Sequence, residues 1–138
     1  MFNPNVVTRN IVNRPVVNDF VALLGRFLIA YIFIVAGWGK VIAYSATAGY
    51  MENMGVSASL LPITILVELG GGLALLFGFQ ARFAAFGLAV FSIITALIFH
   101  SNAEDSINFM KNLSIAGGLL FLLLHGVGRI SIDHVIEK

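Results

Sequence analysis

The sequence predicts an all-α protein, a four-helix transmembrane bundle with its N- and C-termini in the cytoplasm. Hydrophobic residues make up 59% of the 138-residue chain and charged residues 11%, whereas soluble domains carry about 25% charged residues. Four apolar stretches also recur along the chain, at approximately Phe20–Ala43, Leu60–Phe79, Phe83–Phe99 and Phe109–Val127. A helix needs about 20 apolar residues to cross a bilayer, and these stretches meet or approach that length.

We place a polar N-terminal tail at residues 1–19 and the membrane domain at residues 20–138. The tail is rich in Asn and Val and contains Pro4 and Pro15, so we expect a polar extension or a segment that lies on the membrane surface. A cleaved signal peptide is the alternative for the first stretch, because Ala46–Ala48 resembles a cleavage motif. We favour a retained helix, since the tail is longer than a usual leader and "GWGK" precedes the motif.

The three connections between the stretches differ in character. The first, Tyr44–Ser59, contains Met51, Met54 and two tyrosines, and we expect a short helix in the membrane interface there. The second, "GFQAR", is tight and predicts an antiparallel hairpin of the second and third helices. The third, "HSNAEDSIN", is polar and acidic.

The orientation is predicted from the lysines and arginines near the ends of the spans. With a cytoplasmic N-terminus, six of the eight basic residues lie on the cytoplasmic side: Arg9, Arg14, Arg26, Arg82, Arg129 and Lys138. Lys40 and Lys111 lie on the opposite side. This asymmetry places both termini inside, and we call the half of the bundle nearer Lys40 and Lys111 the outer half.

Glu68 is the strongest candidate for a functional residue. It lies about eight residues into the second stretch, roughly 12 Å below the outer surface, where an unpaired carboxylate is costly. Arg26 and Lys40 lie on one face of the first helix, roughly 21 Å apart, and each is a candidate partner for Glu68. Arg26–Glu68 is the candidate structural ion pair, with Lys40 open as the other partner. Alternatively, both cations extend to lipid phosphates.

Other polar residues gather in the predicted outer half. His100 ends the third stretch, and Lys111 and Asn112 begin the fourth. Each is more often a cap or an interfacial residue when taken alone. Together with Lys40 and Glu68 they come from all four helices, and an apolar cavity with a few convergent polar groups is typical of a small-molecule site. We therefore predict an outer-half pocket lined by these five residues.

Aromatic residues and glycines allow two interpretations each. Trp38, Phe99 and Phe109 would flank a flat ligand, although an interfacial aromatic belt accounts for them equally well. The run Gly70–Gly72 leaves space for a ligand beside Glu68 or permits dense helix packing, and packing is the simpler explanation.

Composition excludes several classes of function. A net charge of +1 without a basic run argues against a nucleic-acid partner. Because the chain has no cysteine, disulfides, thiol relays and cysteine-ligated clusters are excluded, and any redox role needs a bound cofactor or a partner. The three histidines are widely spaced, so we expect no metal site.

Five motifs carry a family resemblance: AGWGK, YMENMGV, VELGGGLALLFGF, FHSN and FMKNLSIAGG. With them the chain resembles the DoxX family of small four-helix bacterial inner-membrane proteins, and most closely its YqjF-like members. The likeness runs from about Leu23 to Asp133. It implies a multi-pass protein of the bacterial inner membrane. The family is named for a likeness to a subunit of a thiosulfate:quinone oxidoreductase, so the resemblance also implies a quinone cofactor and a redox partner protein.

Two hypotheses for the function follow. In the first, the pocket binds a quinone or a similar apolar ring, His100 or Lys111 donates to a carbonyl oxygen, and Glu68 exchanges protons. The candidate catalytic residues are then Glu68 and His100, and the candidate ligand-binding residues are Lys40, Lys111, Asn112 and Trp38. In the second, the protein is a non-catalytic membrane subunit or scaffold, and its buried ionic residues specify helix packing. Lipid or small-solute transport is a weaker third option. A homo-oligomer is compatible with each.

Overall fold

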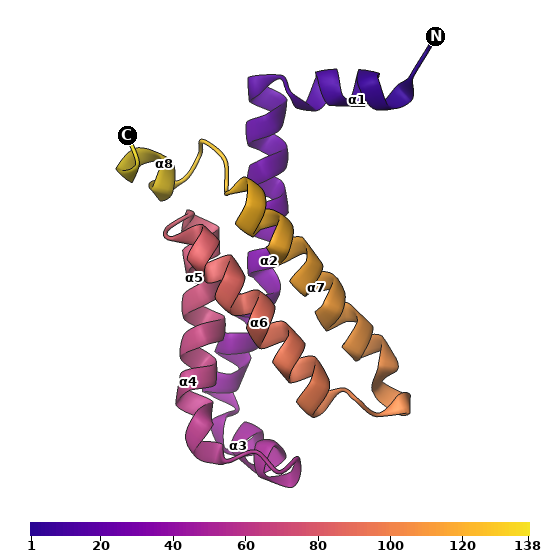
Figure 1. Cartoon of the computed structure of the whole chain (residues 1–138). Helices are drawn as coiled ribbons and strands as arrows, with labels where there is room; N and C mark the ends of the chain where they lie inside the picture. The colour runs from indigo at the N-terminus through magenta and orange to yellow at the C-terminus, as the bar shows by residue number, and fades with distance from the viewer.

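The computed structural model describes all 138 residues, and most of them are helical (Figure 1). In chain order the elements are α1 (Pro4–Val12), α2 (Pro15–Ile42), α3 (Tyr44–Asn53), the 3-10 turn η1 (Ala58–Leu60), α4 (Leu61–Ile65), the π-helical turn η2 (Leu66–Gly70), α5 (Gly71–Phe77), α6 (Ala81–Phe99), the 3-10 turn η3 (Ala103–Asp105), α7 (Ser106–His125) and α8 (Ile132–Ile136). Four helical segments are long and apolar enough to cross a membrane: Pro15–Ile42, Ala58–Phe77, Ala81–Phe99 and Ala103–His125. The prediction of an all-α fold with four spans is confirmed.

The N-terminal tail forms a separate helix over Pro4–Val12, and its last residues, from Pro15, belong to α2. The side chain of Asn3 accepts a hydrogen bond of 3.0 Å from the backbone N–H of Asn5, and Pro4 lies in the first turn of α1. Both features favour a helix start. Pro15 starts α2 in the same way, ahead of the apolar stretch at Phe20. Figure 1 shows that α1 runs across the end of α2 and does not continue it.

The four spans form two antiparallel pairs. The first pair is α2 with the continuous span α4–η2–α5, and the second is α6 with α7 (Figure 1). Glycines allow the first pair to approach closely. A Cβ atom added at Gly37 would lie 2.9 Å from the backbone nitrogen of Leu69, and one added at Gly72 would lie 3.0 Å from Cγ1 of Ile34. The predicted hairpin joins the two pairs through the turn between α5 and α6.

Two glycines of the run Gly70–Gly72, Gly71 and Gly72, serve packing against other helices. A Cβ atom at Gly71 would lie 2.9 Å from Cγ of Leu88 in α6, Gly72 packs against α2, and none of the three glycines lines the pocket described below. The expectation that the run leaves space for a ligand beside Glu68 is therefore wrong. The packing interpretation is confirmed for Gly71 and Gly72.

The buried core is small and lies between the helix pairs. Its members include Phe33 of α2, Leu75 of α5, Leu88 of α6 and Leu119 of α7. Most large apolar side chains point outward instead. An apolar exterior is what a bilayer requires, because lipid takes the place of water around the spans.

The two ends of the bundle are different. Both chain termini, α1, α8 and the α5–α6 turn lie at one end, which we call the terminal end (Figure 1). The short helix α3 and the α6–α7 connection lie at the other, which we call the pocket end. The helix expected in the first connection is therefore present as α3. The placement of the terminal end in the cytoplasm stays a prediction.

Candidate functional site

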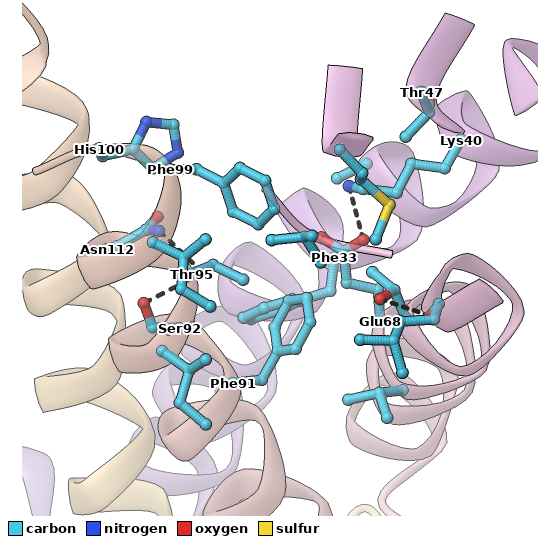
Figure 2. A pocket seen from close by; sticks show the side chains of 18 of the residues that line it. Phe33, Lys40, Thr47, Glu68, Phe91, Ser92, Thr95, Phe99, His100 and Asn112 are labelled. Atoms are coloured by element: carbon cyan, nitrogen blue, oxygen red, sulfur yellow. Dashed lines mark hydrogen bonds and ion pairs between the residues drawn. The ribbon is translucent and has the colours of Figure 1, made fainter. Parts of the chain in front are cut away.

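A cavity of about 440 Å³ lies at the pocket end, between the two helix pairs (Figure 2). This volume is within the range of small-molecule sites, roughly 300–1,000 Å³. Most of the lining is apolar and comes from α2, α3, α4 and α6. Eight polar or charged residues also line it: Lys40, Thr47, Thr64, Glu68, Ser92, Thr95, His100 and Asn112. We call this cavity the pocket.

An ion pair forms one wall of the pocket. Nζ of Lys40 lies 2.7 Å from Oε2 of Glu68, and the side chains are 28% and 8% exposed. Lys40 is in the last turn of α2, where the partial negative charge of the helix terminus also favours a cation. The pair joins α2 to the second span and compensates a carboxylate that would otherwise be buried without a partner.

Glu68 lies in the middle of the π-helical turn η2, Leu66–Gly70. A π-helical turn is wider than an α-helical turn, and such turns occur frequently at functional sites. The turn changes the register of the helix, so that Glu68 lines the pocket while Gly71 and Gly72 face neighbouring helices. Sequence reasoning missed this turn. The nearest signal is the glycine run that begins at Gly70, the last residue of the turn, because glycine weakens a helix interior.

The predicted ion pair between Arg26 and Glu68 is not formed, and this prediction is wrong. Arg26 is 3% exposed and lies at the terminal end, where its Nη1 donates a 2.9 Å hydrogen bond to the backbone oxygen of Val127. Arg26 and Lys40 occupy opposite ends of the interior face of α2, and Lys40 is the cation level with Glu68. Lys40, the alternative candidate, is therefore the residue that pairs with Glu68.

Polar groups from the second helix pair form the opposite wall. Nδ2 of Asn112 donates to Oγ1 of Thr95 at 3.1 Å, and Oγ1 of Thr95 donates to the backbone oxygen of Ser92 at 3.1 Å. Asn112 keeps a second amide hydrogen and its oxygen for other partners. Nδ1 of His100 bonds to a carboxylate oxygen of Asp105, which leaves Nε2 for other partners. Sequence reasoning missed Asp105, although it lies in the acidic connection next to His100.

Two predicted pocket residues lie outside the pocket. Lys111 is exposed and lines a groove between α2 and α7, and Trp38 is 56% exposed on the outside of α2. Neighbouring residues on a helix point about 100° apart, so Asn112 faces the pocket and Lys111 does not. Trp38 likewise is the sequence neighbour of a buried residue, Gly37, and points away from the interior. The predicted roles of Lys111 and Trp38 as pocket residues are wrong.

Helix α3 covers the pocket. Thr47, Tyr50 and Met51 of α3 line it, and Met51 is buried. The ring of Tyr50 stacks on the ring of Phe99 at the end of α6, with centroids 5.6 Å apart and 25° between the planes. Phe99 thus lines the pocket as predicted, whereas Phe109 does not. Sequence reasoning placed a helix here and gave it no role in the site.

A second set of polar contacts holds the terminal end together. The carboxylate of Asp133 accepts hydrogen bonds from the backbone N–H groups of Gln80 at 2.6 Å and Ala81 at 2.8 Å, and so caps the start of α6. Arg82 donates to two backbone oxygens in the last turn of α7, both at 3.0 Å. Unpaired groups at helix ends are satisfied in this way, and we assign these contacts to the fold.

Comparisons with known proteins place the chain among small membrane proteins. The family model DoxX matches residues 21–101. The chain is 49% identical to Inner membrane protein YqjF of Escherichia coli (strain K12) over 123 residues, which cover 87% of this chain and 95% of the relative. It is 32% identical to Inner membrane protein YphA of the same organism over 121 residues, 80% of this chain and 86% of the relative. No solved structure matches.

Proposed function

Because this chain belongs to the DoxX family of inner-membrane proteins, we propose that its pocket binds a quinone, or a similar apolar ring with carbonyl oxygens, for redox chemistry with a partner protein. One observation carries the proposal: the Lys40–Glu68 pair lines a mostly apolar cavity that is large enough for such a ring. Its apolar lining distinguishes this cavity from the polar one of about 470 Å³ beside Arg82 and Asp133 at the terminal end.

The arrangement of polar and apolar groups supports this class of ligand. Figure 2 shows Phe33, Phe91 and Phe99 in the middle of the pocket, with the Lys40–Glu68 pair on one side and Asn112, Thr95 and His100 on the other. A 1,4-quinone has an apolar ring with carbonyl oxygens on opposite edges. Aromatic side chains stack favourably on such a ring, and each polar wall offers a donor to a carbonyl oxygen.

The two walls also suit proton transfer. A bound quinone supplies two-electron, two-proton chemistry, and we assign the electrons to the partner protein. The carboxylate of Glu68 exchanges a proton with the ligand at one wall, while the ammonium of Lys40 stabilises negative charge that develops nearby, as preorganised donors do in other sites. At the other wall, Asp105 fixes Nδ1 of His100. An imidazole held by a carboxylate through one nitrogen is suited to exchange a proton through the other.

A scaffold role is the alternative, and it too has an observation in its favour. The Lys40–Glu68 pair connects two spans and leaves neither charge without a partner, so it would stabilise the helix pair with no ligand present. The two functions differ in their demand on the opposite wall. Both functions use the bonds of His100 to Asp105 and of Asn112 to Thr95, whereas only ligand binding requires the polar atoms that these bonds leave free.

Binding of a short-chain quinone to the protein in lipid nanodiscs tests the proposal. We expect saturable binding, and we expect Glu68→Gln and His100→Ala each to weaken it by roughly 10- to 100-fold, since a hydrogen bond to a charged group contributes about 1.5–3 kcal/mol. Glu52→Gln is the matched control, because Glu52 is exposed and does not line the pocket. Absence of saturable binding, or equal affinity in all variants, would favour the scaffold.

A further inference from the structure

A groove on the side of the bundle adjoins the pocket. It has a volume of about 400 Å³, lies between α2 and α7, and is lined by Ile32, Ile107, Met110, Lys111, Ser114 and Ile115. We call it the lateral groove. Two of its residues, Ile32 and Ile115, also line the pocket. The two spaces therefore share a wall that includes these two aliphatic side chains.

The lateral groove faces lipid. Both of its helices are membrane spans, and Ile32, Ile107 and Met110 are exposed apolar residues on their outer surfaces. Helices α2 and α7 pack mainly against other spans and little against each other. Within a bilayer, such an opening between two spans is filled by hydrocarbon, because water is absent there.

Helix α3 restricts access to the pocket from the aqueous side of the pocket end. Helix α3 lies over the pocket end, and Tyr50 of α3 stacks on Phe99 of α6.

Lys111 lies at the lateral groove and is part of no ion pair within the protein. A lysine in this position extends its ammonium toward lipid phosphates while its stem covers apolar surface.

We propose that the lateral groove is the portal of the pocket, through which a ligand with a hydrocarbon tail enters from the bilayer. The ring occupies the pocket, and the tail lies in the lateral groove between α2 and α7. This inference rests on the proposed function for the ring, and it narrows the ligand class. The natural ligand is a membrane-dissolved ring with a tail, such as an isoprenoid quinone, and not a water-soluble ring.

The affinities of two quinones with the same ring, one with an isoprenoid tail and one without, test the portal in nanodiscs. Ser114→Trp fills the lateral groove from α7, and Ser114 is exposed and does not line the pocket. We expect this variant to weaken binding of the tailed quinone at least tenfold, with less than a twofold change for the tail-less one. Ser114→Ala should leave both affinities unchanged.

The outcomes separate the portal from the proposed function. Equal losses for both quinones in Ser114→Trp, or no loss for either, would overturn the portal. Failure of both quinones to bind the unmodified protein would overturn the proposed function instead. Met110→Trp fills the same groove from a different position, and it replaces Ser114→Trp as the test variant if Ser114→Trp does not fold.

A second measurement needs no quinone. The chain has no cysteine, so Ser92→Cys places a single thiol in the pocket, at a position that is 3% exposed. We expect a membrane-soluble maleimide to label this thiol at least tenfold faster than a water-soluble one, and Ser114→Trp to remove that advantage. Faster labelling by the water-soluble reagent would mean that the pocket opens to water and would overturn the portal.

Discussion

The terminal end and the pocket end of the bundle use their charged residues differently. At the terminal end, Arg26 donates to the backbone oxygen of Val127, Arg82 donates to the last turn of α7, and Asp133 accepts from the first N–H groups of α6. At the pocket end, Lys40 and Glu68 pair with each other beside a cavity. The first set of charges is bound to the backbone, and Arg82 and Asp133 also line a polar cavity of about 470 Å³. Lys40 and Glu68 instead bind each other beside a mostly apolar cavity.

This difference qualifies a common inference about membrane proteins. A charged residue inside a membrane is usually taken as a sign of function, because its burial is costly. Arg26 is the more deeply buried of the two cations of α2, yet its visible partner is a backbone oxygen. Burial alone therefore does not separate structural charges from functional ones. The partner of the charge separates them better: a backbone oxygen for Arg26 and a carboxylate for Lys40.

The largest effect on stability is expected at the terminal end, from Arg26→Ala. This change removes a charged hydrogen bond and leaves the oxygen of Val127 without its partner, so it should lower the free energy of unfolding by about 2–3 kcal/mol. Thermal unfolding in mild detergent measures the loss. If the unfolding midpoint stays the same, Arg26 is not the structural residue described here.

A smaller loss, about 1 kcal/mol, is expected for Asp133→Ala, because it removes the cap of α6. The loss should be local, with faster amide hydrogen exchange at Gln80 and Ala81, whose N–H groups lose their acceptor. Glu137→Ala, an exposed carboxylate in the same C-terminal segment, is the control and should leave this exchange unchanged. Equal exchange rates in both variants would contradict the capping role.

The smallest effect is expected at the pocket end, from Tyr50→Ala. The stack of Tyr50 on Phe99 contributes about 0.5–1.5 kcal/mol, so its loss should raise labelling of a cysteine at position 92 by a water-soluble reagent by roughly two- to tenfold. Tyr50→Phe keeps the ring and should label at the original rate. Labelling that is equally slow in Tyr50→Ala would show that α3 covers the pocket without this stack.

The spans and the interior face of α2 were predictable from the sequence. The four apolar stretches became spans, and Arg26, Ala30, Phe33 and Gly37, which recur at steps of three and four residues, are all buried. Helical periodicity fixes such a face because it depends only on spacing along one helix.

The details of the pocket depended on contacts between helices, which local spacing does not encode. Axial reach left both Arg26 and Lys40 open as partners of Glu68, and only the packing of the spans decides between them. Lys111 and Asn112 are sequence neighbours, so a rotation of α7 about its own axis determines which of them faces the pocket. The cap that Asp133 supplies to Ala81 spans 52 residues of sequence and has no local signal.

Photoaffinity labelling with an azido-quinone identifies where the ring binds, which we place at the pocket end beside Glu68. After illumination in nanodiscs and digestion, we expect label on α6 near Phe91–Phe99 and on the span that contains Glu68, in amounts that fall when unlabelled quinone is in excess. Label on the terminal end, near α8, or label that excess quinone does not reduce, would contradict it.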